Sequence, residues 1–281
     1  MNYRHAFHAG NFADVVKHLA LVGILLHLRQ KEAPFAVIDT HAGRGVYDLR
    51  SEAAQRTGEA QTGIKRILSA FERADSLPPF LDHYLSIVRR TGDDMYPGSP
   101  VLAASLLRPH DRLVAIEEQD DEAAVLSATL ASFQNRTLKS EHADGYARLS
   151  AVLPPAERRG VVLLDPPFEA PDEFYALART TTLALRRFAT GIYLIWFPIK
   201  SLGDASALSG EIVAAGAKKA LHIGIAVAAS GAASSRRLVN AGLIVINPPF
   251  GFAKEMGICL ARVAPCLSAR TELRWLVGED D

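Results

Sequence analysis

The sequence predicts an α/β fold built on a largely parallel sheet. Three short apolar runs each end in a carboxylate, at residues 35–39, 112–117 and 161–165. None of them alternates apolar with polar residues, which is the pattern of strands buried on both faces. Helical patterns separate the runs, and 281 residues are enough for one large domain. We therefore expect a single domain over residues 1–281 with a Rossmann-like core.

The composition is that of an ordinary globular protein, with 49% hydrophobic and 22% charged residues. Lys and Arg together number 31, as do Asp and Glu, so a nucleic-acid partner would need a local basic patch. The N-terminus lacks a basic and then apolar signal, and no apolar run approaches the ~20 residues of a membrane span. Cys259 and Cys266 are too far apart for a C-x-x-C site, which favours buried free thiols. We expect a soluble cytoplasmic protein.

Residues 3–11 are dense in His, Asn and aromatic side chains, and a helix with a 3.6-residue apolar period follows from Ala13. His5, His8 and His18 are candidate metal ligands, but no H-E-x-x-H or C-x-x-C motif accompanies them. We therefore expect no metal.

The run at 35–39 leads into a turn that contains Gly43 and Gly45. Glycines after a buried strand let the backbone approach a ligand closely, as in the cofactor half of a Rossmann sheet. The turn lacks the full G-x-G-x-x-G and G-x-x-x-x-G-K-[ST] patterns, which argues against a dinucleotide and against a P-loop nucleotide. A tight strand-to-helix turn is the alternative interpretation.

Two or three helices without a strand are predicted at residues 51–98, where apolar residues recur at intervals of three and four. The next strand ends at Glu117, although a ribose-binding acid normally follows the glycine turn after about 20 residues. A helical insertion at 51–98, between the first two core strands, explains the longer interval. Just after it, Ser99 is expected either to cap a helix whose first residue is Pro100 or to contact a ligand.

The later elements continue the alternation of strands and helices. Asp144 and Gly145 follow a short predicted strand and either bracket an adenine ring or form a turn. The remaining predictions are helices at 121–133, at 174–188 and from 211, strands at 191–198, 220–227 and 243–247, and a mobile loop at 230–237.

The stretch at 161–169 carries the most informative chemistry. Its apolar strand ends at Asp165, and Pro166 and Pro167 force the chain out of the sheet. Ligands of open α/β sheets bind at this carboxyl edge. Asp165 and the Pro166 carbonyl can accept both hydrogens of an exocyclic amine, and Phe168 can stack on the base, so the motif suits a planar nitrogen substrate. The alternative is a stiffened strand end in which Asp165 caps a helix.

A rival motif occurs at Asn247-Pro248-Pro249-Phe250. Asn247 could also accept from an amine, but it follows a late strand typical of an edge hairpin. Asp165 instead follows a strand expected beside the glycine-turn strand, so we favour Asp165.

Five blocks of the sequence together resemble the RlmJ family of 23S ribosomal RNA adenine-N6 methyltransferases. They are YRHAFHAGNFADVVKH at 3–18, DTHAG at 39–43, YPGSP at 96–100, LDPPFE at 164–169 and RFATGIY at 187–193. The likeness spans nearly the whole chain, and the N-terminal block is far more specific than D-P-P-F. The resemblance implies a class I methyltransferase core that depends on S-adenosyl-L-methionine (SAM), with a small helical insertion.

The resemblance also implies roles for individual residues. Asp165, Pro166 and Phe168 would form the catalytic motif, and Tyr3 and Phe168 would contact the substrate RNA. Phe168 stands where family members often have Tyr, which keeps the ring and loses a hydroxyl. The implied cofactor contacts are His18, His41, Gly43, Ser99, Glu117, Asp144, Gly145 and Asp165.

We therefore predict SAM-dependent methylation of N6 of a single adenine in 23S rRNA, of the adenine 2030 type, by a monomer acting on naked or partly assembled RNA. One alternative is a DNA adenine-N6 methyltransferase, although no extra target-reading domain is visible. Another is a non-catalytic RNA-binding or ribosome-assembly module.

Overall fold

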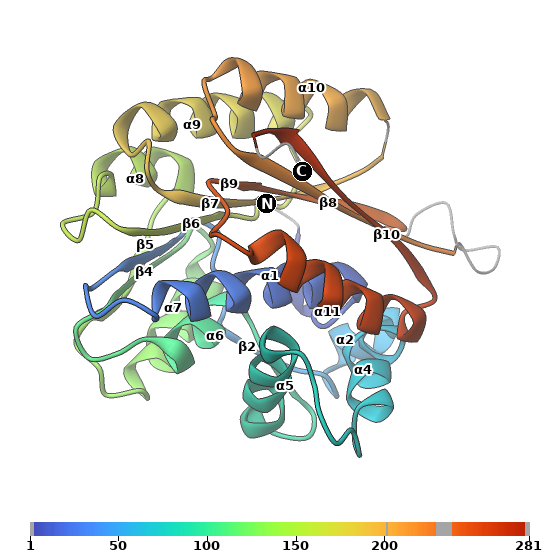
Figure 1. Cartoon of the computed structure of the whole chain (residues 1–281). Helices are drawn as coiled ribbons and strands as arrows, with labels where there is room; N and C mark the ends of the chain where they lie inside the picture. The colour runs from blue at the N-terminus through green and yellow to red at the C-terminus, as the bar shows by residue number, and fades with distance from the viewer. Residues whose placement is uncertain (1–2, 201, 229–237, 279–281) are drawn as a thin grey trace.

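The computed structural model describes residues 3–200, 202–228 and 238–278. Within these ranges the centre is an eight-stranded sheet in the order β10-β8-β9-β7-β6-β1-β4-β5 (Figure 1). Its strands are β1 (Ala36–Asp39), β4 (Arg112–Glu117), β5 (Leu138–His142), β6 (Gly160–Leu164), β7 (Ile192–Pro198), β8 (Ala220–Val227), β9 (Asn240–Ile246) and β10 (Ala269–Val277). Strands β7, β6, β1, β4 and β5 are parallel, whereas β9 runs antiparallel between β7 and β8.

Helices cover both faces of this sheet (Figure 1). One layer is α8 (Gly145–Val152), α9 (Glu173–Arg187) and α10 (Leu202–Ala214), and the other is α1 (Phe12–Leu28), α6 (Ser99–Leu106), α7 (Asp120–Ala131) and α11 (Phe252–Cys266). In β6, Val161 and Leu163 pack toward the second layer, and Val162 and Leu164 toward the first. Burial on both faces explains the continuous apolar run.

The chain leaves the sheet between β1 and β4. There the short strands β2 (Val46–Asp48) and β3 (Met95–Pro97) pair antiparallel, and the helices between them are α2 (Glu52–Thr57), α3 (Glu59–Thr62), α4 (Ile64–Ala70) and α5 (Pro79–Thr91). The prediction of no strand in this region is wrong, because three-residue strands are too short to give a periodic pattern. The division into one domain with an insertion at 51–98 stays a prediction.

Helix α1 is buried on nearly all sides, although the sequence suggested one apolar face. It packs against α5, α6 and α11 as well as the sheet. Asn11 caps its first turn, because the side-chain oxygen accepts from the backbone N–H of Ala13 and Asp14, both at 2.9 Å. The helix thereby carries the polar side chains of Lys17 and His18 into the interior, where they are 3% and 1% exposed.

The structure corrects several boundaries. Helix α6 begins at Ser99 itself with Gly98 as the N-cap, so Ser99 is not a cap; its hydroxyl instead donates to the buried Asp39 carboxylate. Helix α10 begins at Leu202, well before the expected start at 211, because small residues hide its period. Strand β9 lies inside the sheet, and β10, which the sequence did not reveal, takes the edge beside β8.

The predicted loop at 230–237 lies outside the described residues. In the part of the chain that is described, none of the helices combines the length and apolar character needed to cross a membrane. Both cysteines are free thiols, with Cys259 buried and Cys266 half-buried on α11.

Candidate active site

Two cavities open at the carboxyl edge of β1, β4 and β6. They share a wall made by Tyr3, His5, Lys17, Asp165 and Pro167. The first cavity extends along the ends of β1 and β4, and the second extends past the end of β7. Asp165 therefore lies between two cavities, each of which can bind one reactant.

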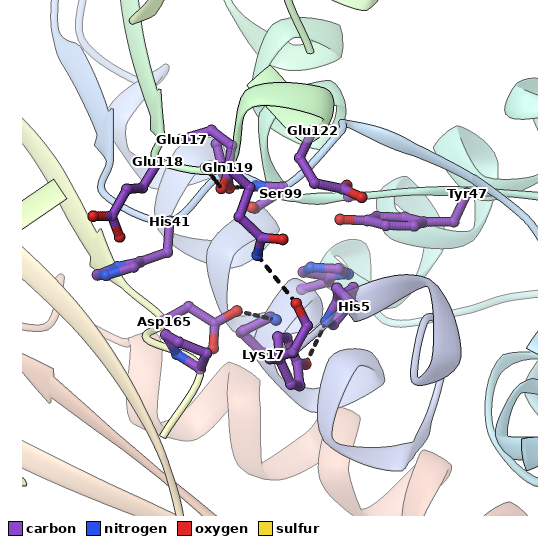
Figure 2. A pocket seen from close by; sticks show the side chains of 16 residues that line it. His5, Lys17, His41, Tyr47, Ser99, Glu117, Glu118, Gln119, Glu122 and Asp165 are labelled. Atoms are coloured by element: carbon purple, nitrogen blue, oxygen red, sulfur yellow. Dashed lines mark hydrogen bonds and ion pairs between the residues drawn. The ribbon is translucent and has the colours of Figure 1, made fainter. Parts of the chain in front are cut away.

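Glu117 is fixed at the first cavity by the backbone (Figure 2). Its two carboxylate oxygens accept from the N–H groups of Gly43 and Gln119, each at 2.8 Å. Burial raises the pKa of Glu117, and the two N–H groups oppose that rise. Gly43 has φ +60°, and a Cβ there would lie 2.1 Å from the Tyr47 hydroxyl. The glycine turn thus lets the backbone approach closely enough to orient the acid.

His41 presents a neutral ring to the same cavity. The Thr40 hydroxyl donates to the carbonyl of Leu163 at 3.0 Å, so it accepts from His41 Nδ1 at 2.8 Å. This assignment of hydrogens leaves His41 Nε2 as an acceptor. Burial lowers the pKa of His41 to about 4, so the ring carries no charge at neutral pH. The His41 and Tyr146 rings meet in a T-shaped arrangement, with their centroids 5.0 Å apart.

Asp39 and His18 lie deeper, beneath the first cavity. Ser99 donates to Asp39 Oδ2 at 2.6 Å, whereas Asp39 Oδ1 has no hydrogen-bond partner among the described residues. Burial raises the pKa of Asp39 to about 7. His18 Nδ1 lies 2.7 Å from the Tyr96 hydroxyl, and burial lowers the pKa of His18 to about 3. His18 and Ser99 therefore form the neutral floor of the cavity.

Lys17 is the centre of the shared wall (Figure 2). Its ammonium group contacts Asp14 at 2.8 Å and also the carboxylate of Asp165, and all three side chains are at most 15% exposed. Burial disfavours the charged form, but the two carboxylates outweigh burial and raise the pKa of Lys17. His5 Nε2 joins the group at 2.9 Å from Asp14. This role of Lys17 was not predicted from the sequence. The available signal was an acid, Asp14, three positions before a lysine at the start of an apolar helix.

The second cavity is aromatic on one side. The Phe168 ring packs against the Phe174 ring, with centroids 4.7 Å apart, and makes an edge-on contact with the Trp196 ring at a centroid distance of 5.7 Å. Phe168 has φ +52°, a left-handed conformation that is uncommon for a bulky residue. Lys200 and His8 line the same cavity. This lining of aromatic and basic side chains suits a planar ring attached to an anionic backbone.

Two predicted cofactor residues do not line the first cavity. Asp144 caps α8, because its side chain accepts from the N–H of Tyr146 at 2.8 Å and of Ala147 at 3.3 Å. Gly145 packs so closely that a Cβ would lie 1.9 Å from the Thr40 carbonyl oxygen. Both support the turn that carries His41.

The rival motif has a structural task at the opposite edge of the sheet. Asn247 follows the antiparallel strand β9, and its side-chain amide donates to the carbonyls of Ala189 at 2.9 Å and Gly191 at 2.7 Å. Asn247 lines neither cavity, and the neighbouring Phe250 is 90% exposed. Among the described residues, no group of three His, Cys, Asp or Glu side chains is placed to hold a metal ion.

Comparison with known proteins decides the family. A family model described as ribosomal RNA large subunit methyltransferase D, RlmJ, matches residues 32–277. The chain belongs to the RlmJ family. Two RlmJ relatives named ribosomal RNA large subunit methyltransferase J match nearly end to end. The Escherichia coli (strain K12) protein is 38% identical, over 99% of this chain and 100% of its own. The Haemophilus influenzae protein is 35% identical, over 99% of this chain and 98% of its own.

Solved structures share the fold of this RlmJ family member. A protein from Legionella pneumophila is 29% identical and has a TM-score of 0.85, with 95% of this chain and 98% of that chain covered. A probable spermidine synthase from Corynebacterium glutamicum, 12% identical, has a TM-score of 0.50 over 93% of this chain and 75% of that chain, which supports the fold alone. The predicted Rossmann-like class I methyltransferase core is confirmed.

Proposed function

We propose that this RlmJ family member transfers a methyl group from SAM to N6 of a single adenine in 23S rRNA, of the adenine 2030 type. The observation that carries the proposal is the position of Asp165 in the wall between two cavities. The ends of β4 and β1 supply a fixed acid and a neutral histidine on one side, and aromatic rings lie on the other.

The residues of the first cavity fit SAM. The Glu117 carboxylate, already aligned by two backbone N–H groups, suits the paired hydroxyls of a ribose. The glycine turn leaves room beside it that a Cβ would fill, and His41 Nε2 offers a further acceptor for the amino-acid end. His18 and Ser99 form the floor, and Asp144 and Gly145 act by holding the His41 turn. When bound, SAM supplies an electrophilic methyl group.

The residues of the second cavity would handle the adenine. Phe168 stacks on the base, while Asp165 and the Pro166 carbonyl accept the two N6 hydrogens, which frees the nitrogen lone pair for attack. Asp165 also accepts the proton that N6 releases once the N–C bond has formed. Lys17 holds the Asp165 carboxylate in place, and Tyr3 separates the base from the cofactor side. Catalysis then comes from positioning and from hydrogen bonds, with no strong base.

The test is methyl transfer from labelled SAM to protein-free 23S rRNA and, in parallel, to adenine-containing DNA. We expect label in the RNA alone, recovered as N6-methyladenosine after digestion to nucleosides. Transfer to DNA instead would favour a DNA methyltransferase, and RNA binding without any transfer would favour a non-catalytic assembly module.

A further inference from the structure

The helical insertion makes several contacts with the N-terminal segment that contributes to the shared wall. The Thr57 hydroxyl donates to the carbonyl of Phe7, and the N–H of Ile64 donates to the carbonyl of Gly10 at 2.8 Å. The Arg56 guanidinium lies over the Phe7 ring at 5.5 Å. These contacts hold the chain just before α1 begins.

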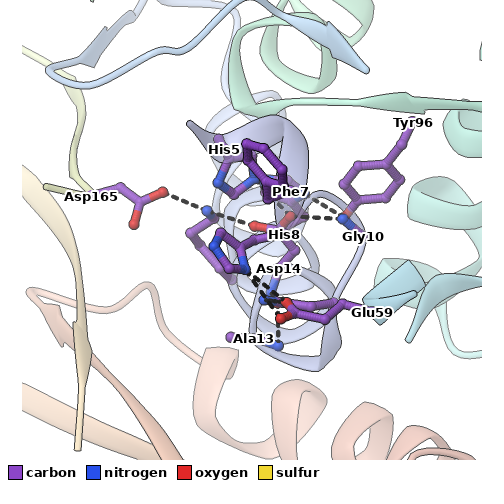
Figure 3. Close-up of polar contacts among 12 residues, drawn as sticks. His5, Phe7, His8, Gly10, Ala13, Asp14, Glu59, Tyr96 and Asp165 are labelled. Carbon is purple, nitrogen blue, oxygen red and sulfur yellow. Dashed lines mark hydrogen bonds and ion pairs between the residues drawn. The ribbon is translucent and has the colours of Figure 1, made fainter. Parts of the chain in front are cut away.

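Glu59 makes the charged contact between the insertion and the N-terminal segment (Figure 3). Both of its carboxylate oxygens lie 3.1 Å from His8 Nδ1, and Oε2 also accepts from the side-chain amide of Asn11 at 3.1 Å. The His8 ring in turn stacks on the Tyr3 ring, with centroids 5.6 Å apart and planes inclined by 9°. His8 lines the second cavity, and Tyr3 lines both cavities.

Glu59 itself lines neither cavity, so any effect that it has on the reaction must pass through the residues it holds. We propose that Glu59 is a positioning residue: by fixing His8 it places the Tyr3 ring in the wall shared with Asp165, which makes the helical insertion part of the catalytic unit. This inference rests on the proposed function.

The charges around His8 support the same assignment. The groups that face it are Glu59 from α3, Asp14 from α1 and the Tyr3 ring. Burial lowers the pKa of His8, but Glu59, with a smaller contribution from Asp14, outweighs burial and raises that pKa. A protonated imidazole stacked on a tyrosine gains a cation–π attraction, so the negative charge of Glu59 strengthens the stack.

The test compares Glu59→Gln, Glu59→Asp and the matched control Glu52→Gln, which changes an exposed acid at the start of α2 in the same insertion. At saturating SAM and RNA we expect Glu59→Gln to lower turnover by roughly tenfold or more, because small displacements of an active-site wall have large kinetic effects. Glu59→Asp should restore a large part of the loss, and Glu52→Gln should turn over like wild type.

A double-mutant cycle separates positioning from a general structural effect. In a His8→Gln background, Glu59→Gln should cost no more than about twofold, since the route through His8 is already broken. Equal costs in both backgrounds, or wild-type turnover in Glu59→Gln, would overturn the inference.

The titration of His8, followed by NMR, does not depend on methyl transfer. Its midpoint should move to lower pH in Glu59→Gln and stay in place in Glu52→Gln. An unmoved midpoint in Glu59→Gln refutes the contact even in a preparation inactive on RNA. If wild type transfers no methyl to RNA while the midpoint does move, the proposed function fails and the contact stands.

Discussion

Replacing Lys17 by Met tests the charge arrangement of the shared wall. The Lys17 side chain is 4% exposed and its ammonium group contacts both Asp14 and Asp165, so its loss leaves two carboxylates in a poorly hydrated site. Breaking a buried ion pair by removing one partner costs about 3–5 kcal/mol. A chain of this size loses roughly 2–4 °C in Tm for each kcal/mol, so we expect a Tm lower by about 6–20 °C.

Lys65→Met is the matched control. Lys65 also contacts an aspartate, Asp94, but its side chain is 24% exposed and that of Asp94 is 40% exposed. Exposed pairs contribute at most about 1 kcal/mol, so this variant should unfold close to wild type. Urea unfolding of the two variants gives the comparison. If Lys17→Met were destabilised no more than Lys65→Met, the buried cation would not be the centre of the wall.

Three further predictions follow from the packing around the first cavity. Gly145→Ala should destabilise the fold by about 1–3 kcal/mol, because the added Cβ would lie 1.9 Å from the Thr40 carbonyl oxygen. The control Gly210→Ala on α10 adds a Cβ with no atom within 4 Å and should not destabilise the fold; thermal unfolding compares the two variants. Glu117→Ala should weaken binding of S-adenosyl-L-homocysteine by at least about tenfold in calorimetry, and a change below twofold would remove the ribose role. Asp39 has its pKa raised to about 7, so folding takes up a proton and stability should fall as pH rises from about 4 to 7. Asp39→Asn should flatten that slope in urea unfolding, and an unchanged slope would contradict the shift.

Much of the fold could be predicted because its signals are local. The run at 161–164 had to be buried on both faces, and the two prolines had to end it at Asp165, whatever the rest of the chain did. The pairing of this strand with β1, expected from its place after the glycine turn, is confirmed. Strand β10 lies beyond the last strand expected, at 243–247, although exposed Arg270, Glu272 and Arg274 alternate with half-buried residues in the period-2 pattern of a half-buried strand.

The candidate site was harder to predict because its contacts join distant parts of the chain. Lys17 and Asp165 are 148 positions apart, and no pattern in either segment predicts that the two side chains are in contact. Ser99 looked like a helix cap, yet the helix begins one residue early and frees its hydroxyl for Asp39. The second cavity depends on Trp196 and Lys200, which lie at the end of β7 beside the D-P-P-F turn only once the sheet has formed.

The most direct measurement is single-turnover methyl transfer to protein-free 23S rRNA by wild type, Asp165→Ala and Asn247→Ala. Alanine offers no acceptor for the N6 hydrogens, so Asp165→Ala should lose at least about a hundredfold in rate. The variant should stay folded, because Lys17 keeps its contact with Asp14. Asn247→Ala should transfer at the wild-type rate once its folded fraction is matched, because the Asn247 side chain donates to backbone carbonyls at the far edge and lines neither cavity. Full activity in Asp165→Ala, with transfer lost in Asn247→Ala, would contradict the assignment of the site.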